Sequence, residues 1–220
     1  MTDLYFTLRD ICFTRSGRPP LFQNLNFEVR KGQAIAITGD NGAGKTSLFH
    51  LMMGLHKPQS GEVHAFGELR LEEKDFLDVR TQTGLLFQNS DDQLFCPTVE
   101  EDVSFGPLNL GASHKQALEI THKTLSSLGL AGYEKRITHH LSGGEKRMVA
   151  LASVLAMKPK VLLLDELTSG LDRQAYQRLK EVLLELSVAK VIISHDAQFL
   201  SDLTHQHYHL EDGQLHFREN

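Results

Sequence analysis

The residue types best suited to chemistry lie in a glycine-rich segment that follows an apolar run. The segment reads Gly39-Asp40-Asn41-Gly42-Ala43-Gly44-Lys45-Thr46, and a stretch of helical character follows from Ser47. Backbone N–H groups of such a loop, together with the positive end of the following helix, bind phosphate oxygens. We therefore predict that residues 39–47 bind a nucleotide, with Lys45 on the terminal phosphates and the Thr46 hydroxyl on Mg²⁺.

Two adjacent carboxylates end the most hydrophobic run in the chain. Asp165 and Glu166 directly follow Val161-Leu162-Leu163-Leu164. Beside a phosphate loop, Asp165 is suited to holding Mg²⁺ and Glu166 to polarising an attacking water. Gln88 and His195 also end apolar runs, where they could contact Mg²⁺, the water or the terminal phosphate. The predicted catalytic residues are Glu166, His195 and Gln88, and the predicted Mg²⁺ ligands are Thr46, Gln88 and Asp165.

A second candidate anion site lies further along the chain. Ser142, Gly143, Gly144 and Glu145 match a capping box, and we expect them to open a helix that runs to about Met157. Exposed N–H groups at such a helix start bind anions. One chain with two phosphate-binding loops, separated by a helical insert, suggests that ATP lies between two copies of the chain.

Short apolar runs predict the elements that position these residues. Continuous runs of this kind are typical of strands buried on both faces of a parallel sheet, and ligands bind beyond the carboxyl ends of such strands. The N-terminal part, residues 4–29, alternates apolar and polar residues as antiparallel strands do. Helices are predicted over residues 115–128 and 172–186, and a hairpin over residues 208–217. The predicted parallel strands lie at residues 34–38, 84–88, 161–165 and 191–195.

These elements define the predicted fold class and its division. We expect an α/β protein with a P-loop NTPase (RecA-like) core built on a parallel sheet. An N-terminal antiparallel β subdomain joins this core, which spans about residues 1–88 and 159–220. An inserted α-helical subdomain spans about residues 89–158. The whole chain, residues 1–220, is thereby expected to form one ATP-binding domain.

The bulk composition limits the classes of partner. The formal net charge of -5 gives no electrostatic support to binding nucleic acid. The two cysteines, Cys12 and Cys96, are too far apart in sequence for a thiolate metal motif. We see no signal peptide, and the longest uncharged apolar stretch, residues 148–157, is far short of the ~20 residues that a membrane span needs. If the protein works at a membrane, we expect it to lie there through partners.

Taken together, these motifs resemble those of the ATP-binding cassette (ABC) ATPases over nearly the whole chain. The phosphate loop, Gln88, the signature segment Leu141-Ser142-Gly143-Gly144-Glu145, residues 161–166, Ser169-Gly170-Leu171-Asp172 and His195 stand in that family's order. The resemblance implies a head-to-tail pair, identical or not, in which the signature segment binds ATP held by the partner's phosphate loop. It also implies that Asp172 communicates between the two sites and that Glu166 is the catalytic base.

A narrower stretch resembles the importers of the energy-coupling-factor type. Residues 87–95 and 97–110 are most similar to their cobalt- and nickel-transport ATPases, although vitamin-uptake members share these features. The resemblance implies a transmembrane coupling protein that docks near residues 88–95, with Asp91 or Asp92 facing a basic helix. It further implies a substrate-binding membrane subunit and a place on the cytoplasmic face of the cell membrane.

Two positions depart from the family pattern. Arg15 stands where an aromatic residue usually stacks on adenine, and a guanidinium can stack in the same way; Phe13 is nearby. Leu167 replaces the proline that usually follows the catalytic glutamate.

The sequence favours two rival functions and one further site less strongly. A soluble ABC protein acting on ribosomes or DNA usually has two cassettes or a long coiled-coil insertion, and neither is present. A P-loop kinase would leave Ser142 without a role. An alternating histidine group near the C-terminus suggests a metal sensor, but a polar strand face explains it better. That group is His205, His207, His209 and His216.

Overall fold

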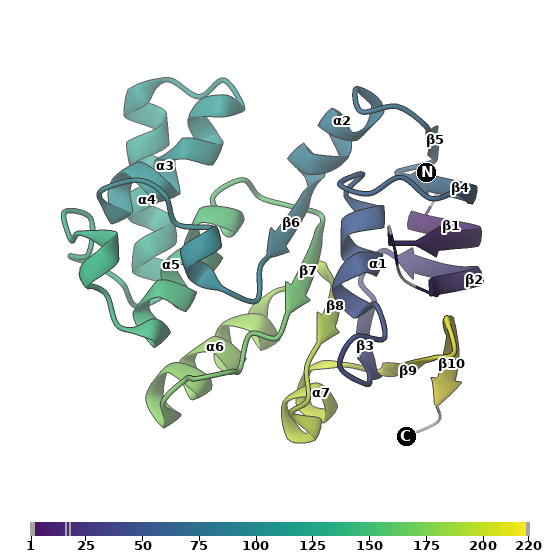
Figure 1. The fold of residues 1–220 in the computed structure, drawn as a ribbon. Coiled ribbons are helices and arrows are strands. Elements are labelled where there is room, and N and C mark those ends of the chain that lie inside the picture. The colour runs from purple at the N-terminus through teal and green to yellow at the C-terminus, as the bar shows by residue number, and fades with distance from the viewer. Residues whose placement is uncertain (1–2, 16, 18, 219–220) are drawn as a thin grey trace.

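A six-stranded, mostly parallel sheet forms the centre of the computed structural model, which describes residues 3–15, 17 and 19–218 (Figure 1). Its strand order is β10-β9-β3-β8-β7-β6, and β10 alone runs antiparallel to its neighbour. These strands are β3 (Ala34–Gly39), β6 (Thr83–Leu86), β7 (Val161–Asp165), β8 (Ala189–Ile193), β9 (Gln206–Glu211) and β10 (Gln214–Arg218). The predicted α/β class with a parallel core is confirmed.

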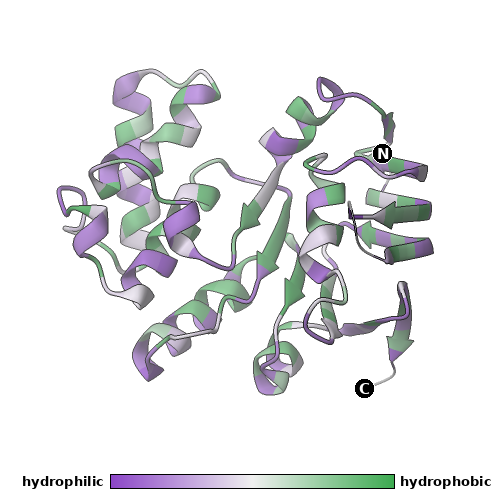
Figure 2. Ribbon diagram, in the orientation of Figure 1, coloured by the Kyte–Doolittle hydropathy of each residue, from purple (hydrophilic) through white to green (hydrophobic). Residues whose placement is uncertain are grey.

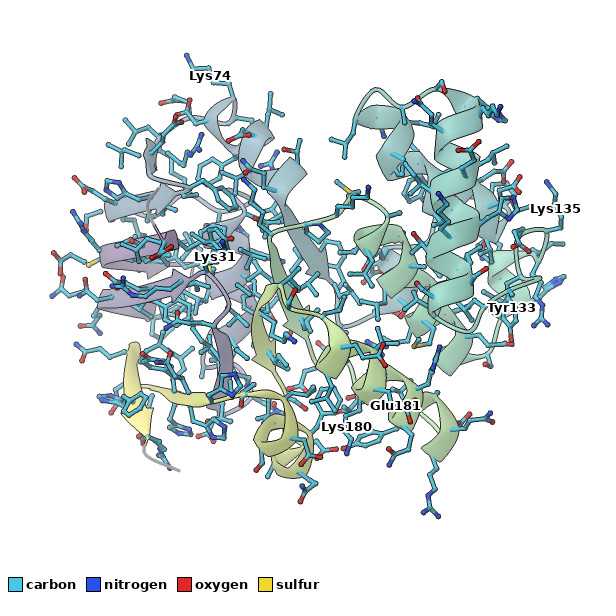
Figure 3. The ribbon with its side chains drawn as sticks, turned by 180° about the vertical axis from the view of Figure 1, so that it is seen from behind. Lys31, Lys74, Tyr133, Lys135, Lys180 and Glu181 are labelled. Atoms are coloured by element: carbon cyan, nitrogen blue, oxygen red, sulfur yellow. The ribbon has the colours of Figure 1, made fainter. Side chains whose placement is uncertain are left out.

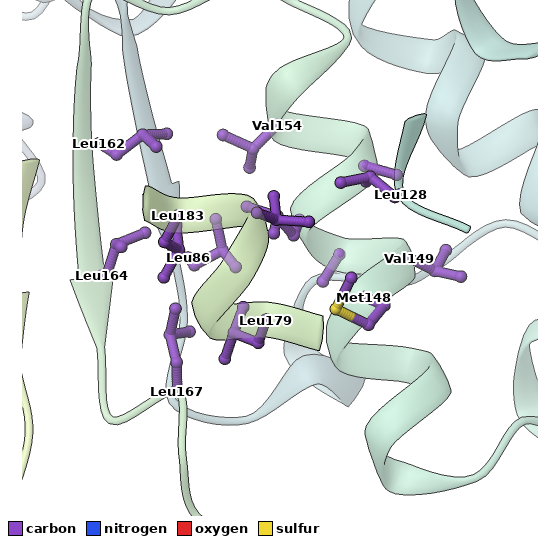
Figure 4. Packing of buried hydrophobic residues seen from close by; sticks show 14 of the residues in the cluster. Leu86, Leu128, Met148, Val149, Val154, Leu162, Leu164, Leu167, Leu179 and Leu183 are labelled. Atoms are coloured by element: carbon purple, nitrogen blue, oxygen red, sulfur yellow. The ribbon is translucent and has the colours of Figure 1, made fainter. Parts of the chain in front are cut away.

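The central strands are buried on both faces, which explains their continuous apolar runs. Every residue of β7 and of β8 is buried, and both strands appear as hydrophobic ribbon in Figure 2. Leu162 and Leu164 of β7 pack with helices on one face, as Figure 4 shows, whereas Val161 and Leu163 join the cluster on the opposite face. This alternation holds the strands rigidly and fixes where their carboxyl ends lie.

Three helices cover one face of this sheet. They are α5 (Gly143–Leu155), α6 (Arg173–Glu185) and α7 (Ala197–Leu203). Leu179 and Leu183 of α6 are fully buried and belong to the apolar cluster that also contains Leu164 of β7 and Val154 of α5 (Figure 4). The predicted helix over residues 172–186 is therefore present, with Asp172 as its N-cap rather than its first residue.

A four-stranded antiparallel sheet and α1 cover the other face. The sheet has the order β2-β1-β4-β5, with β1 (Leu4–Thr14), β2 (Pro20–Arg30), β4 (Ser60–Ala65) and β5 (Glu68–Arg70). Leu48 and Phe49 of α1 (Lys45–Met52) are fully buried between the two sheets. The alternation of residues 4–29 predicted β1 and β2, but β4, β5 and the neighbouring helix α2 (Asp75–Gln82) were not predicted.

The remaining helices gather at the side of the molecule away from the antiparallel sheet (Figure 1). They are α3 (Val99–Asn109) and α4 (His114–Ser127), which pack with α5, and the short turns η1 (Ser90–Asp92) and η2 (Thr138–His140). Capping boxes open α3 at Thr98, α4 at Ser113 and α5 at Ser142. These helices lie within residues 89–158, and the division of the chain into subdomains stays a prediction.

The hairpin near the C-terminus is present, but its place in the sheet was missed. β9 and β10 turn at Asp212 and Gly213, as predicted. β9 also pairs in parallel with β3, the strand that leads into the phosphate loop. His209 and His216 face each other across the hairpin, yet no group of three metal-ligating side chains occurs within the described residues.

Within the part of the chain that the structure covers, every helix is too short or too polar to cross a lipid bilayer.

Candidate functional site

The strand ends of the central sheet open on one cavity of about 770 Å³. We call it the nucleotide cavity. Groups far apart in the sequence meet there because β3, β6, β7 and β8 run in parallel and end at the same edge. Of the residues predicted from sequence, the structure brings together Arg15, Asn41, Gly42, Gly44, Lys45, Thr46, Ser47, Gln88, Asp165, Glu166 and His195.

The phosphate loop has the backbone that its glycines permit. Gly44 has φ 110°, and an added Cβ would lie 3.0 Å from the Phe22 ring. At Gly39, an added Cβ would lie 2.5 Å from the Leu210 carbonyl oxygen of β9. The loop therefore depends on glycine at both positions, and β9 supports it from the side.

The Lys45 ammonium is held at the mouth of this loop. It is buried, and its Nζ donates to the carbonyl oxygens of Gly39 at 2.7 Å and Asp40 at 3.1 Å. An ammonium has three N–H donors, so one remains for an oxygen in the cavity. A phosphate group is the ligand that this positive charge and the start of α1 favour.

Oxygen ligands suited to Mg²⁺ lie between the loop and β7. The Thr46 hydroxyl donates to Asp165 Oδ2 at 2.6 Å. Burial raises the pKa of Asp165, and the hydrogen bond from Thr46 partly opposes that rise. A hydroxyl, a carboxylate and the Gln88 side-chain amide in one cavity are the hard oxygen donors that Mg²⁺ prefers. The residues present therefore fit this ion.

Glu166 is held in a strained position at the end of β7. It has φ 49°, which is uncommon for a residue with a Cβ, and its N–H donates to the Ile193 carbonyl of β8 at 2.9 Å. Its Oε1 is buried without a hydrogen-bond partner among the described residues. A carboxylate oxygen left bare in a cavity is a ready acceptor for a proton or a water hydrogen.

His195 lies between this carboxylate and the phosphate loop. Its Nε2 is 3.3 Å from Glu166 Oε1, which is within ion-pair range, and no hydrogen bond joins the two atoms. The same Nε2 lies 3.1 Å from Asn41 Oδ1. Burial raises the pKa of Glu166, and the nearby His195 lowers it by a smaller amount.

The signature segment lies elsewhere on the same chain. Ser142 Oγ accepts from the Glu145 N–H at 3.3 Å, and Glu145 Oε2 accepts from the Ser142 N–H at 2.8 Å. Ser142, Gly144 and Glu145 line a second cavity of about 640 Å³, which shares no lining residue with the nucleotide cavity. Gly143 has open space where a Cβ would stand. A single chain therefore keeps its two candidate phosphate sites apart.

Asp172 and Arg15 line different cavities. Asp172 lines the second cavity and caps α6, because its Oδ1 accepts from the Ala175 N–H at 2.8 Å. Arg15 is exposed on the wall of the nucleotide cavity. Phe13 is buried and packs its ring on Phe22 and His56, so it is not free to stack on a base.

Several lining residues carried no sequence signal of their own. Pro20 and Leu21 of β2 form part of the cavity wall beside Arg15. Ser169 also lines it; the sequence singles out its segment, residues 169–172, but predicts no role for Ser169 itself. Leu167, where proline was expected, is buried in the apolar cluster under α6.

Comparison with known proteins identifies the family. Residues 22–169 match the ABC transporter family. A putative ABC transporter ATP-binding protein of Nitratidesulfovibrio vulgaris is 49% identical over 208 residues, which cover 94% of this chain and 76% of that protein. An energy-coupling factor transporter ATP-binding protein EcfA of Methanothermobacter thermautotrophicus is 43% identical over 212 residues, 94% of this chain and 68% of that protein.

A solved structure agrees with this result. CbiO1 from Clostridium perfringens, described as part of the ABC transporter complex CbiONQ, superposes with a TM-score of 0.87 at 30% identity, covering 98% of this chain and 88% of CbiO1. The chain belongs to the ABC transporter family. It is an ATP-binding subunit that uses Mg²⁺ and hydrolyses ATP in step with transport, and proteins of this class work as dimers.

Proposed function

We propose that this chain energises an importer of the energy-coupling-factor type, with cobalt or nickel ions as the transported substrate. The EcfA relatives and the structural likeness to CbiO1 support the type of importer. The metal assignment rests on the resemblance of residues 87–110 to cobalt- and nickel-transport ATPases. The first alternative is that the same motor drives a vitamin importer, and the second is that the chain is an ABC ATPase without a role in transport.

The observation that carries the catalytic part of the proposal is the separation of the two cavities. Lys45, Thr46, Asp165, Glu166 and His195 share one cavity, whereas the signature segment lines another. Because neither half surrounds a nucleotide alone, two chains arranged head to tail would complete each site. Ser142 and Gly143 of one chain would then bind the terminal phosphate held by Lys45 of its partner, while Asp172 would link the two sites.

The residues of the nucleotide cavity have different roles in ATP hydrolysis. Lys45 and the N–H groups of residues 39–47 bind the phosphates and stabilise the charge that develops during transfer. Thr46, Asp165 and Gln88 would hold Mg²⁺, which neutralises phosphate charge when bound. Glu166 accepts a hydrogen from the attacking water, and His195 orients that carboxylate and contacts the terminal phosphate.

A hydrophobic patch marks the surface proposed for the membrane partner. Phe95 and Phe105 stack edge to face, with ring centroids 4.9 Å apart, and are 62% and 46% exposed. Leu108 of α3, the helix of Phe105, and Leu110, the C-cap of that helix, are also exposed. Apolar residues grouped on a surface in this way are typical of an interaction site. We assign it to the transmembrane coupling protein, which would place this chain on the cytoplasmic face of the membrane.

The acidic residues beside this patch differ in availability. Asp91 Oδ1 already accepts from Lys146 Nζ at 2.6 Å. Asp92 is exposed on the same short turn. Of the two carboxylates suggested by the sequence, Asp92 is therefore the better candidate for contact with a basic helix.

Purification of the chain from its native membranes tests the proposal. We expect a small multi-span coupling protein and a substrate-binding membrane subunit to co-purify, and we expect them to stimulate ATP hydrolysis. Uptake of radioactive Co²⁺ or Ni²⁺ by vesicles of the complex should depend on ATP, and a vitamin taken up instead would select the alternative. Stimulation by a small phosphoryl acceptor, with no membrane partner, would contradict the importer.

A further inference from the structure

Arg147 of α5 is a buried cation that the proposed mechanism does not use. Its side chain lies in the protein interior, with 8% of the residue exposed, and burial lowers the pKa of its guanidinium. No carboxylate pairs with it among residues 3–15, 17 and 19–218. A buried charge without a carboxylate partner is costly, so the groups that accept its hydrogen bonds indicate what it is retained for.

The acceptors of Arg147 come from two separate loops of the nucleotide cavity. Its Nη1 donates to the Gln88 carbonyl oxygen at 2.8 Å, and its Nη2 donates more weakly to the Ser169 carbonyl oxygen at 3.4 Å. Gln88 follows β6 and Ser169 follows β7, and both line the cavity. One guanidinium therefore joins two loops of the nucleotide cavity.

The helix that carries Arg147 begins at the signature segment. Ser142 is its N-cap, five residues before Arg147, which corresponds to about 7.5 Å along the helix axis. Two further contacts join α5 to the segment after β6. Lys146 pairs with Asp91 at 2.6 Å, and the Gln93 side-chain amide donates to the Ala150 carbonyl at 3.3 Å. The N-terminal half of α5 and residues 88–93 are thus held together as one unit.

A second buried cation shows what a purely structural arrangement looks like. Lys190 of β8 is also buried, and burial lowers its pKa. Its Nζ donates to the carbonyl oxygens of Leu183 and Leu186 at 2.5 and 2.8 Å, both at the end of α6. Neither of these leucines lines the nucleotide cavity. Lys190 satisfies one helix end, whereas Arg147 spans two loops of the site.

We propose that Arg147 is a positioning residue that couples the signature segment of a chain to the Gln88 and Ser169 loops of the same chain. A phosphate bound at Ser142, supplied by the partner's nucleotide, would shift α5, and Arg147 would transmit that shift to the chain's own nucleotide cavity. The Nε of Arg147 has no partner within the described residues, so the guanidinium keeps a donor for a new contact when α5 moves. This inference rests on the proposed head-to-tail dimer.

The test compares nucleotide binding with dimer formation in the full-length chain. Arg147→Met is combined with Glu166→Gln, which slows hydrolysis, and Lys190→Met in the same background is the matched control. We measure ATP-dependent dimerisation by analytical ultracentrifugation and ADP affinity of the monomer by calorimetry. Arg147→Met should weaken dimerisation about tenfold and leave ADP affinity within about twofold. Lys190→Met should lower the melting temperature but leave dimerisation unchanged.

In the chain with Glu166 intact, the steady-state parameters give an independent readout. Arg147→Met should lower the cooperativity of ATPase activity with respect to ATP and lower kcat more than it changes KM. If Arg147→Met does not fold, Arg147→Lys takes its place. A single ammonium cannot reproduce the two nitrogens that reach separate loops, and dimerisation should weaken about threefold.

The outcomes separate this inference from the proposed function. If Glu166→Gln alone does not dimerise with ATP, the head-to-tail site is wrong. If Glu166→Gln dimerises and every folded Arg147 variant dimerises equally tightly with unchanged cooperativity, the coupling role of Arg147 is overturned. An equal loss of dimerisation in Lys190→Met would also overturn it, because the effect would then follow from general destabilisation.

Discussion

The nucleotide cavity and the signature segment differ in how their polar groups are accommodated. The nucleotide cavity holds charge in the interior: Asp165 and Glu166 are 3% and 8% exposed, and burial raises the pKa of both carboxyl groups. The signature segment is exposed at Ser142 and satisfies its own polar groups through the reciprocal bonds with Glu145. The buried charges of the nucleotide cavity destabilise the chain until a ligand compensates them, whereas the signature segment is stable without a ligand.

This difference indicates how the two regions would respond to ATP. The cavity gains most when phosphate and Mg²⁺ compensate its buried charges, so binding to one chain should come first. The signature segment keeps the hydroxyl hydrogen of Ser142 and the N–H groups of Gly143 and Gly144 for a ligand. It should therefore contribute chiefly to the affinity between chains. Changes in the two regions should then affect different measurements.

The largest effect is expected at Glu166. Glu166→Gln preserves shape but removes the proton acceptor, so turnover should fall by roughly 10²–10⁴-fold. ATP affinity should change little, and ATP should accumulate a dimer that sizes at twice the mass of the chain. Single-turnover hydrolysis measures the rate of the chemical step, and light scattering measures the mass of the dimer. Near-normal turnover in this variant would remove Glu166 from the mechanism.

Lys45→Ala should come next, with its clearest effect on nucleotide binding. The ammonium would make charge-assisted hydrogen bonds to the terminal phosphates, and losing them should weaken ATP binding about 10–100-fold. Calorimetry with ATP and ADP checks this, since ADP lacks the terminal phosphate and should be less affected. Equal losses for both nucleotides would mean that Lys45 acts on the loop or on the phosphate that ADP retains, rather than on the terminal phosphate of ATP.

Ser142→Ala probes the other region and should leave ATP binding to the monomer unchanged. In the Glu166→Gln background, the dimer would lose one hydroxyl–phosphate hydrogen bond at each of two sites, so dimerisation should weaken about tenfold. The variant also loses a helix cap, which costs about 1 kcal/mol of stability.

The chain provides a matched control for that cap. Ser113 makes the same capping box at the start of α4, with Gln116 in the place of Glu145. Ser113→Ala should lower the melting temperature to a similar extent without changing dimerisation. If both serine variants weaken the dimer equally, Ser142 has no direct contact with the partner's nucleotide.

The two regions also differed in how well the sequence predicted them. Each motif residue is identifiable because a local pattern fixes its backbone: glycines at the phosphate loop, a capping box at Ser142 and an apolar strand before Asp165. The capping box at Ser142 was predicted, and the structure has it. The convergence of Gln88, Glu166 and His195 followed from placing their strands in one parallel sheet. Local rules and one topological rule therefore reached most of the candidate site.

Long-range pairing set the limit of prediction. β9 pairs with β3 across more than 170 residues, and only the folded chain reveals that Leu210 of β9 closes on Gly39. β4 is half polar and β5 has three residues, so neither has a period that marks a strand. Arg147 looks like a surface charge next to Lys146 in the sequence. Its burial is determined by the two loops that close over it.

Melting temperatures measured over a range of pH isolate the contribution of the Glu166 carboxyl group to stability. The raised pKa of Glu166 means that the folded state binds its proton more readily than the unfolded state does. Its contribution to stability is therefore full below the ordinary glutamate pKa of about 4.3 and is lost as pH rises through the raised value. Glu166→Gln should accordingly melt at a higher temperature than the unchanged protein at neutral pH. The difference should shrink as the pH approaches 4, and a constant difference across the series would contradict this account.

The smallest effect is expected at Tyr133, which lies at the edge of the molecule in Figure 3. Its hydroxyl donates to Glu145 Oε1 at 2.8 Å, and Arg136 donates to the same oxygen at 3.0 Å while lying 3.6 Å from the Tyr133 ring centroid. Tyr133→Phe removes one of these two bonds and keeps the ring, so the remaining bond from Arg136 should still orient Glu145 for the capping box, which Glu145 closes through Oε2.

Dimerisation of Tyr133→Phe in the Glu166→Gln background should therefore weaken only about twofold to fivefold, with ATP affinity of the monomer unchanged. Adding Arg136→Gln should cost more than the sum of the two single changes, because Glu145 Oε1 then loses both donors. Sedimentation analysis of the four variants completes this double-mutant cycle. Strict additivity would show that the two residues do not act through Glu145, and the signature segment would then owe its geometry to the capping box alone.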